Sequence, residues 1–457
     1  MGDVTLLSFV CTLCFATLLT LLCTSNVAFA MNQDGEVPQE VPLTTGIGEG
    51  SEPAVPVISD EPQSTTDGDS QAGFDVDGSE MASEDAARES LMADVRDYQR
   101  SIERIEQQQG AYAAGLSEQL LSLGLALQRN GEHGLAIDAF KRGAHLARIN
   151  EGLYSTRQMA LLQGEIASHI ALGAFETADE RQRYLYRVQA ETLSDVSRGQ
   201  AFMQHAVWQR QAYEAGIGED PFSRLTRMYS LYRLALTEFV ASEGNSSPLL
   251  LPPLYGMLRA QYLISGFVGE TSSGRFRDGA VLGEEESRQM AYGNLSYKEG
   301  TSVIRAIFDV TLAMPEQSIE DRAKISMMLG DWQFWHGKRK EAFETYGLVY
   351  RELADADDAQ ALSAGFFDTP QALPALEGVR ALPDREEESE GHLLLEFGVS
   401  ERGRVTDLTR LDEFAANDAK ADSIMRRLRQ TPFRPRISDG MPVETKGLRW
   451  AYDTSNW

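Results

Sequence analysis

The sequence predicts a mostly α-helical protein, an α-solenoid of helical hairpins followed by a small α+β domain with the element order β-β-α-β. Apolar residues recur with helical spacing from about residue 86 to residue 354, with almost no alternating strand pattern. Two segments of this stretch share one spacing of small, turn and aromatic residues, as expected of stacked helical repeats. After residue 390 the pattern changes to short extended runs around one amphipathic helix.

The composition indicates a folded protein that does not bind nucleic acid. The chain of 457 residues is 42% hydrophobic and 24% charged, which suits a globular protein and excludes a polytopic membrane protein. Its formal net charge is −27. Because nonspecific binding to phosphate backbones needs clustered cations, this charge argues against a nucleic-acid partner.

The first 30 residues predict a targeting segment. Residues 4–23 are uncharged and strongly apolar, and Ala28-Phe29-Ala30 is a pattern that a signal peptidase could cut after Ala30. We therefore predict a signal peptide, with Ala28 and Ala30 as processing residues, and an exported protein. An uncleaved membrane anchor is the alternative, because residues 4–23 are long enough to cross a bilayer, and lipidation at Cys23 is another. The membrane is an expected partner only if residues 4–23 remain uncleaved.

Residues 31–85 form a separate acidic zone. They contain fourteen Asp and Glu residues, no Lys or Arg, and several prolines. Large apolar residues are too few there to build a core, and the like charges repel one another. The zone is therefore predicted to be a disordered, extended tether.

Residues 86–354 carry the repeat pattern of the predicted solenoid. In two segments a Gly is followed 12 residues later by Ala and 16 residues later by an aromatic residue. These residues are Gly124, Ala136 and Phe140 in the first segment and Gly330, Ala342 and Tyr346 in the second. Small residues allow two antiparallel helices to approach closely, and the aromatic ring fills the groove beside them. The two segments resemble tetratricopeptide repeats, which implies a scaffold for protein binding.

Between the two clear repeats the pattern is weaker. Helices are predicted over residues 201–215, 222–241 and 253–265. A glycine-rich interval, residues 266–293, predicts a long loop or lid over the solenoid. Residues 355–389, with their prolines and an acidic run, predict a linker to the C-terminal domain.

The C-terminal domain is predicted over residues 390–457. Extended runs over 392–399 and 403–411 form a hairpin, 418–428 forms a helix, and 446–452 forms the last strand. Two turns and the exit of the predicted helix between them stand out. They are Glu401-Arg-Gly-Arg-Val405, Leu428-Arg-Gln-Thr-Pro-Phe433-Arg-Pro435 and Asp439-Gly440-Met-Pro-Val443. Together they resemble the C-terminal domain of TonB-type energy transducers, and this resemblance implies a bacterial envelope protein.

This resemblance implies that an extended partner segment pairs with an exposed edge of the sheet. In the last strand, Leu448, Trp450 and Tyr452 should face the helix that contains Ile424 and Leu428. The predicted partner-binding residues of this strand are Leu448, Arg449, Trp450, Ala451 and Tyr452. A basic cluster that includes Arg426, Arg427, Arg429, Arg434 and Arg436 could seat an acidic partner or the acidic tether; an ordinary solvated helix face is the alternative.

The sequence offers no catalytic site, cofactor site or metal site. The three cysteines all lie in the first 23 residues, and the six histidines are scattered singly. His133 and His336 are predicted to be solvated turn residues, and Trp332, Phe334 and Trp335 to be packing residues rather than a ligand pocket.

The predicted function is therefore that of a non-enzymatic adaptor in the periplasm of a Gram-negative bacterium, with protein segments as partners. A transducer anchored in the inner membrane and a cell-wall enzyme remain the alternatives.

Overall fold

The computed structural model describes residues 78–453, apart from residues 219, 276–282, 316, 355, 357, 380–381, 384, 390 and 415–417. The predicted signal peptide, its processing residues Ala28 and Ala30, and the tether up to residue 77 lie outside these residues. Within the described part of the chain, no helix is long and apolar enough to cross a membrane.

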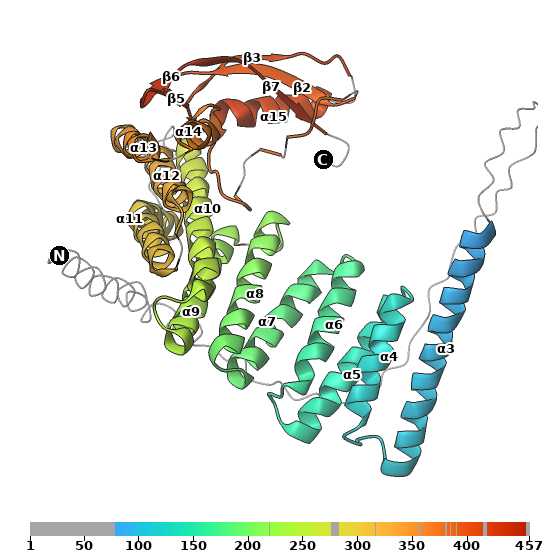
Figure 1. Cartoon of the computed structure of the whole chain (residues 1–457). Helices are drawn as coiled ribbons and strands as arrows, with labels where there is room; N and C mark the ends of the chain where they lie inside the picture. The colour runs from blue at the N-terminus through green and yellow to red at the C-terminus, as the bar shows by residue number, and fades with distance from the viewer. Residues whose placement is uncertain are drawn as a thin grey trace, which may run out of the picture.

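The helices form a curved solenoid in which each helix packs mainly on its neighbours in sequence (Figure 1). Helix α3 (Gly78–Gln109) comes first. Five hairpins follow: α4 (Leu116–Arg129) with α5 (His133–Glu151), α6 (Arg157–Ala171) with α7 (Phe175–Thr192), α8 (Asp195–Glu214) with α9 (Pro221–Glu243), α10 (Leu251–Arg275) with α11 (Glu284–Ala313), and α12 (Ile319–Trp335) with α13 (Arg339–Ala354). A single 3-10 turn, η1 (Pro248–Leu250), precedes α10. The predicted mostly helical solenoid is confirmed, and it resembles tetratricopeptide repeats.

Glycines at helix crossings explain why these hairpins pack closely. A Cβ atom added to Gly124 would overlap the ring of Phe140, and one added to Gly330 would overlap the ring of Tyr346. Both aromatic rings are completely buried. The two repeat signatures therefore work as predicted, with the missing side chain of one helix making room for the ring of its partner.

Two boundaries predicted from the sequence are wrong. Helix α3 begins at Gly78, inside the predicted tether over residues 31–85. The predicted lid over residues 266–293 is absent from the described residues, because α10 continues to Arg275 and α11 already begins at Glu284. Gly293 of this interval serves helix packing instead, since a Cβ there would lie 2.7 Å from Cγ1 of Val268.

The predicted linker over residues 355–389 is also partly structured. Helix α14 (Ala359–Phe367) packs on α13 through the buried ring of Phe367. Strand β1 (Gln371–Ala372) pairs with β4 (Phe433–Arg434) of the C-terminal domain. We call residues 370–389 the connector, because they join the end of the solenoid to the last domain.

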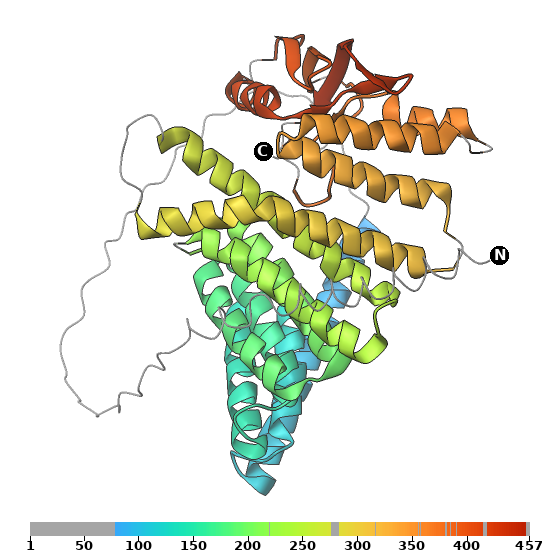
Figure 2. The same cartoon turned by 90° about the vertical axis from the view of Figure 1, so that its left-hand side faces the viewer.

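The C-terminal domain covers the far end of the solenoid, beside α12, α13 and α14 (Figure 2). Its three-stranded antiparallel sheet has the order β3 (Val405–Arg410), β2 (Leu393–Val399), β7 (Thr445–Tyr452). Helix α15 (Asp418–Gln430) packs against the sheet, and a small hairpin of β5 (Arg436–Ser438) and β6 (Met441–Val443) precedes β7. The predicted β-β-α-β order is present, with the short strands β4, β5 and β6 inserted before the last strand.

Candidate functional site

Strand β7 forms one edge of the C-terminal sheet. It pairs antiparallel with β2 from Leu393 opposite Tyr452 to Val399 opposite Thr445. The carbonyl of Ala451 accepts a hydrogen bond of 3.0 Å from the N–H of Glu386, so the backbone of Ala451 faces away from β2. Backbone direction alternates along a strand, and Arg449 therefore faces outward as well. This outward backbone is the part of β7 that a partner strand can reach.

The side chains of β7 are less available than the sequence prediction assumed. Trp450 and Tyr452 are buried in the core of the domain with Ile424 and Leu428 of α15, and Leu448 packs at its margin. Their predicted common orientation is correct, but it removes them from the partner surface. Ala451 is buried too, which leaves Arg449 as the exposed side chain, paired with Glu396 at 3.2 Å.

The connector already occupies part of this edge. Besides the hydrogen bond from Glu386, the guanidinium carbon of Arg385 lies 4.7 Å from the ring centre of Trp450. A cavity of about 170 Å³ lies beside it and is lined by residues that include Leu382, Thr431 and Trp450. The sequence interpretation of these residues as a plain linker missed this contact, because a backbone hydrogen bond leaves no side-chain pattern.

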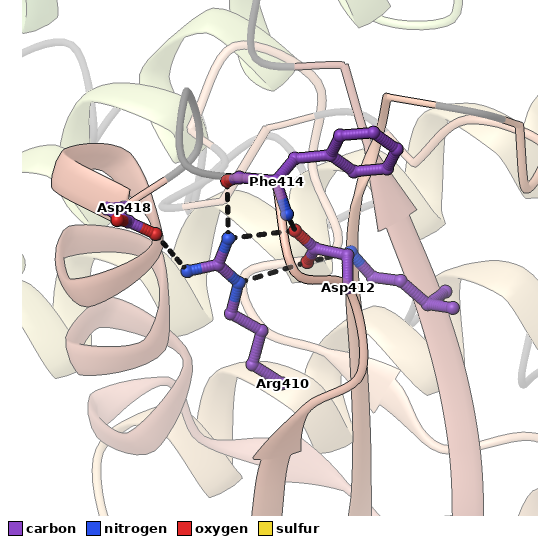
Figure 3. A network of polar contacts seen from close by, with 5 residues as sticks. Arg410, Asp412, Phe414 and Asp418 are labelled. Atoms are coloured by element: carbon purple, nitrogen blue, oxygen red, sulfur yellow. Dashed lines mark hydrogen bonds and ion pairs between the residues drawn. The ribbon is translucent and has the colours of Figure 1, made fainter.

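The opposite edge of the sheet is irregular. Asp407 in β3 has φ +51°, and the pairing of β3 with β2 shifts register beside it. At the end of β3, Arg410 donates to Asp412 (2.8 Å), to Asp418 (2.7 Å) and to the carbonyl of Phe414 (2.7 Å), which joins the end of β3 to the first residue of α15 (Figure 3). Bulges and charges of this kind block strand pairing, so β7 is the better edge for a partner.

The predicted basic cluster divides into two groups. Arg426, Arg427 and Arg429 are exposed on α15, and none of the three forms an ion pair within the described residues. Arg434 is buried instead, and its Nη1 lies 3.0 Å from both carboxylate oxygens of Asp331 in α12. It therefore joins the C-terminal domain to the solenoid.

Asp179 of α7 is a buried polar group that is paired within the solenoid. Asp179 accepts hydrogen bonds from Arg224 and from the indole of Trp208, although burial opposes its charge; the balance lowers its pKa. Trp332 and Phe334 are buried core residues, as predicted. Among the residues that the structure describes, no cluster of His, Cys, Asp or Glu has the size of a metal site.

His336 differs from its prediction as a solvated turn residue. Its ring lies against Trp332 and Tyr297, and burial lowers its pKa to about 4. His205, which bonds Gln189 at 2.7 Å, likewise has its pKa lowered to about 4 by burial.

These two histidines predict a loss of stability in acid. Both are neutral in the folded state, whereas in the unfolded chain they take up protons near pH 6.5. The unfolded state therefore gains protons first, and stability is full above pH 6.5 and falls towards pH 4, by up to about 3 kcal/mol per histidine. Denaturant unfolding of the wild type and a His205→Asn, His336→Asn variant across this range should show a shallower pH slope in the variant. Parallel slopes would contradict the assignment.

The similarity of this chain to known proteins is limited to helical-repeat structures. No protein-family profile and no curated protein matches the sequence. The chain is similar in structure to the TPR-like repeats of a kinesin light chain from Podosopora anserina, at 15% identity over 54% of this chain and 99% of that one, with a TM-score of 0.33. It is also similar to a variant form of those repeats (15% identity, 52% and 96%, TM-score 0.33) and to BtubC (BKLC) from P. vanneervenii (13%, 65% and 97%, TM-score 0.31).

Proposed function

We propose that this protein is a non-enzymatic adaptor that binds extended segments of partner proteins at the β7 edge and carries them on a helical-repeat scaffold. The observation that carries the proposal is the hydrogen bond from Glu386 to Ala451, since an extended segment of the chain already pairs with this edge. Pairing of a foreign strand with such an edge uses the same backbone groups.

The resemblance to TonB-type C-terminal domains supports this proposal and suggests the location. The segment Glu401–Val405 contains the β2–β3 turn and the first residue of β3, Phe433 lies in β4, and Asp439-Gly440 forms the β5–β6 turn. We therefore propose the periplasm of a Gram-negative bacterium as its location. Intact-mass analysis would test this location, because an uncleaved residue 4–23 segment would favour an inner-membrane transducer.

A proline at Arg449 tests the edge directly. Proline removes the outward N–H of β7 but no hydrogen bond to β2, so the sheet should stay folded. A photo-crosslinking residue at position 449 would first identify the partner segment in cells. We expect the affinity of the purified Arg449→Pro chain for that segment to fall at least tenfold, with an unchanged melting temperature.

Two further variants complete this test. Glu386→Pro removes the competing donor of the connector and should tighten partner binding. Neutralising the exposed arginines of α15, with Arg426, Arg427 and Arg429 each changed to Gln, should have little effect. If this triple variant loses the partner while Arg449→Pro retains it, the basic face of α15 is the binding site and the edge proposal is wrong.

A further inference from the structure

The connector makes a second contact, on the solenoid. The N–H of Val379 donates to the carbonyl of Leu376 at 3.2 Å, which closes a tight turn over residues 376–379. Leu376 and Val379, its first and fourth residues, pack against the largest apolar cluster of the solenoid. Glu377 is exposed. The turn therefore presents two apolar side chains to the helices and leaves its second side chain in solvent.

One arginine binds the backbone of this turn, and a second arginine lies beside it. Nε of Arg259, on α10, donates to the carbonyl of Glu377 at 2.6 Å. A Cβ atom on Gly378 would lie 3.0 Å from that Nε and 3.2 Å from Nη1 of Arg210, on α8. Gly378 also has φ +77°, which favours glycine at the third position of a turn. The backbone conformation selects glycine there, and a side chain would also crowd the two arginines.

The arginines are positioned by the repeat packing itself. Tyr232 lies in the space left by Gly256 of α10, where an added Cβ would overlap its ring. Burial raises the pKa of Tyr232, while the nearby charges of Arg259 and Arg210 oppose that rise. Arg210 is balanced by Glu214 at 2.9 Å, whereas Arg259 forms no ion pair with a carboxylate within the described residues. Its charge is directed at a backbone carbonyl.

We propose that this surface of α8 and α10, formed by Arg210, Arg259 and the adjoining apolar groove, is a binding site for a partner turn of the pattern Leu-x-Gly-Val. It is filled in the resting chain by residues 376–379. Both helices are the first members of their hairpins, so the site lies on one continuous face of the solenoid. The groove binds the apolar side chains at positions one and four, and Arg259 donates to the carbonyl of position two. Position three must lack a side chain. This inference rests on the proposed adaptor function and assigns the solenoid its ligand.

The tethered turn must dominate over a free peptide in the wild-type chain. A covalently linked segment acts at an effective concentration in the millimolar range, so a peptide added in trans competes poorly. Removing the two apolar anchors of the connector should free the site while leaving its arginines intact. A partner that carries the same pattern should then bind the vacated site.

The test uses the full chain with Leu376→Ser and Val379→Ser, and a fluorescent peptide of residues 372–379. We expect anisotropy to show binding to this release variant at least tenfold tighter than to the wild type. The same peptide with Gly378→Ala should lose at least tenfold in affinity, and so should the release variant with Arg259→Gln added. Arg449→Pro in the release variant should leave peptide binding unchanged, which separates this site from the β7 edge.

Two outcomes would contradict the proposal. A folded release variant that ignores the peptide, or that binds the Gly378→Ala peptide equally well, overturns the proposal. A chain with Gly378→Ala alone is a second, milder release variant if the first does not fold, as judged by circular dichroism. If neither folds, the turn is a structural element of the solenoid and not a replaceable ligand.

Discussion

Gly124→Leu and Gly330→Leu are each expected to lower the free energy of unfolding by about 3 kcal/mol or more. At both positions even a single added Cβ atom would overlap an aromatic ring of the partner helix, that of Phe140 or Tyr346. The rings are completely buried and cannot turn away without moving other core residues. The helices of each hairpin must therefore separate. Urea unfolding followed by circular dichroism measures the loss.

Gly134→Leu is the matched control for this prediction. Gly134 lies in α5, in the same hairpin as Gly124, but it is exposed and a Cβ there would meet nothing within 4 Å. Leucine favours helix more than glycine does, so this variant should be as stable as the wild type or slightly more stable. If Gly330→Leu has the same urea midpoint as the wild type and the control, the glycines are not the packed positions of the repeats.

The sequence predicts the repeats only where their spacing is regular. The same contact between a glycine and an aromatic ring recurs at Gly199 with Phe239, and at Gly300 with Trp332. The two residues of these pairs are separated by different lengths of chain, because the helices in this part of the solenoid are longer and unequal. No fixed period marks them, and the middle of the solenoid could be predicted as helical but not as repeats.

The prediction of a lid is wrong because glycine occurs both in loops and where two helices approach closely. Glycines in a polar stretch usually indicate a loop. Here Gly293 lies within α11, where its missing side chain admits Val268 of α10. Only the partner helix distinguishes these cases, and it is 25 residues away in the sequence.

The candidate site was predictable in its strand and not in its contacts. Side chains alternate between the two faces of a strand, so the sequence of residues 446–452 predicts that Trp450 and Tyr452 share one face. Both are buried in the structure, in agreement with this prediction. The hydrogen bonds of Glu386 and Arg259 to backbone carbonyls depend on the path of the connector, which no side-chain pattern records. The sequence groups Arg434 with the basic cluster because its partner, Asp331, lies 103 residues earlier.

Arg434→Met is expected to cost about 3–5 kcal/mol and to loosen the C-terminal domain from the solenoid. The variant leaves the carboxylate of Asp331 buried without its guanidinium partner, with the hydrogen bond from the hydroxyl of Tyr346 (2.8 Å) retained. Removing one partner of a buried pair costs more than the pair itself contributes. Denaturant unfolding measures the loss, and limited proteolysis should cut the connector faster than in the wild type.

Neutralising the stranded carboxylate should rescue this variant. In the double variant Asp331→Asn, Arg434→Met, the amide oxygen can still accept the hydrogen bond from Tyr346 without a buried charge, so most of the loss should be recovered. Burial raises the pKa of Asp331, against the opposing effect of Arg434. Without Arg434 the carboxyl should take up a proton more readily in the folded state, and stability gained from that proton is present at low pH and lost as the pH rises. The defect of Arg434→Met relative to the wild type should therefore shrink towards pH 4. A double variant as unstable as the single one, with a defect independent of pH, would show that Arg434 acts through packing and not through its charge.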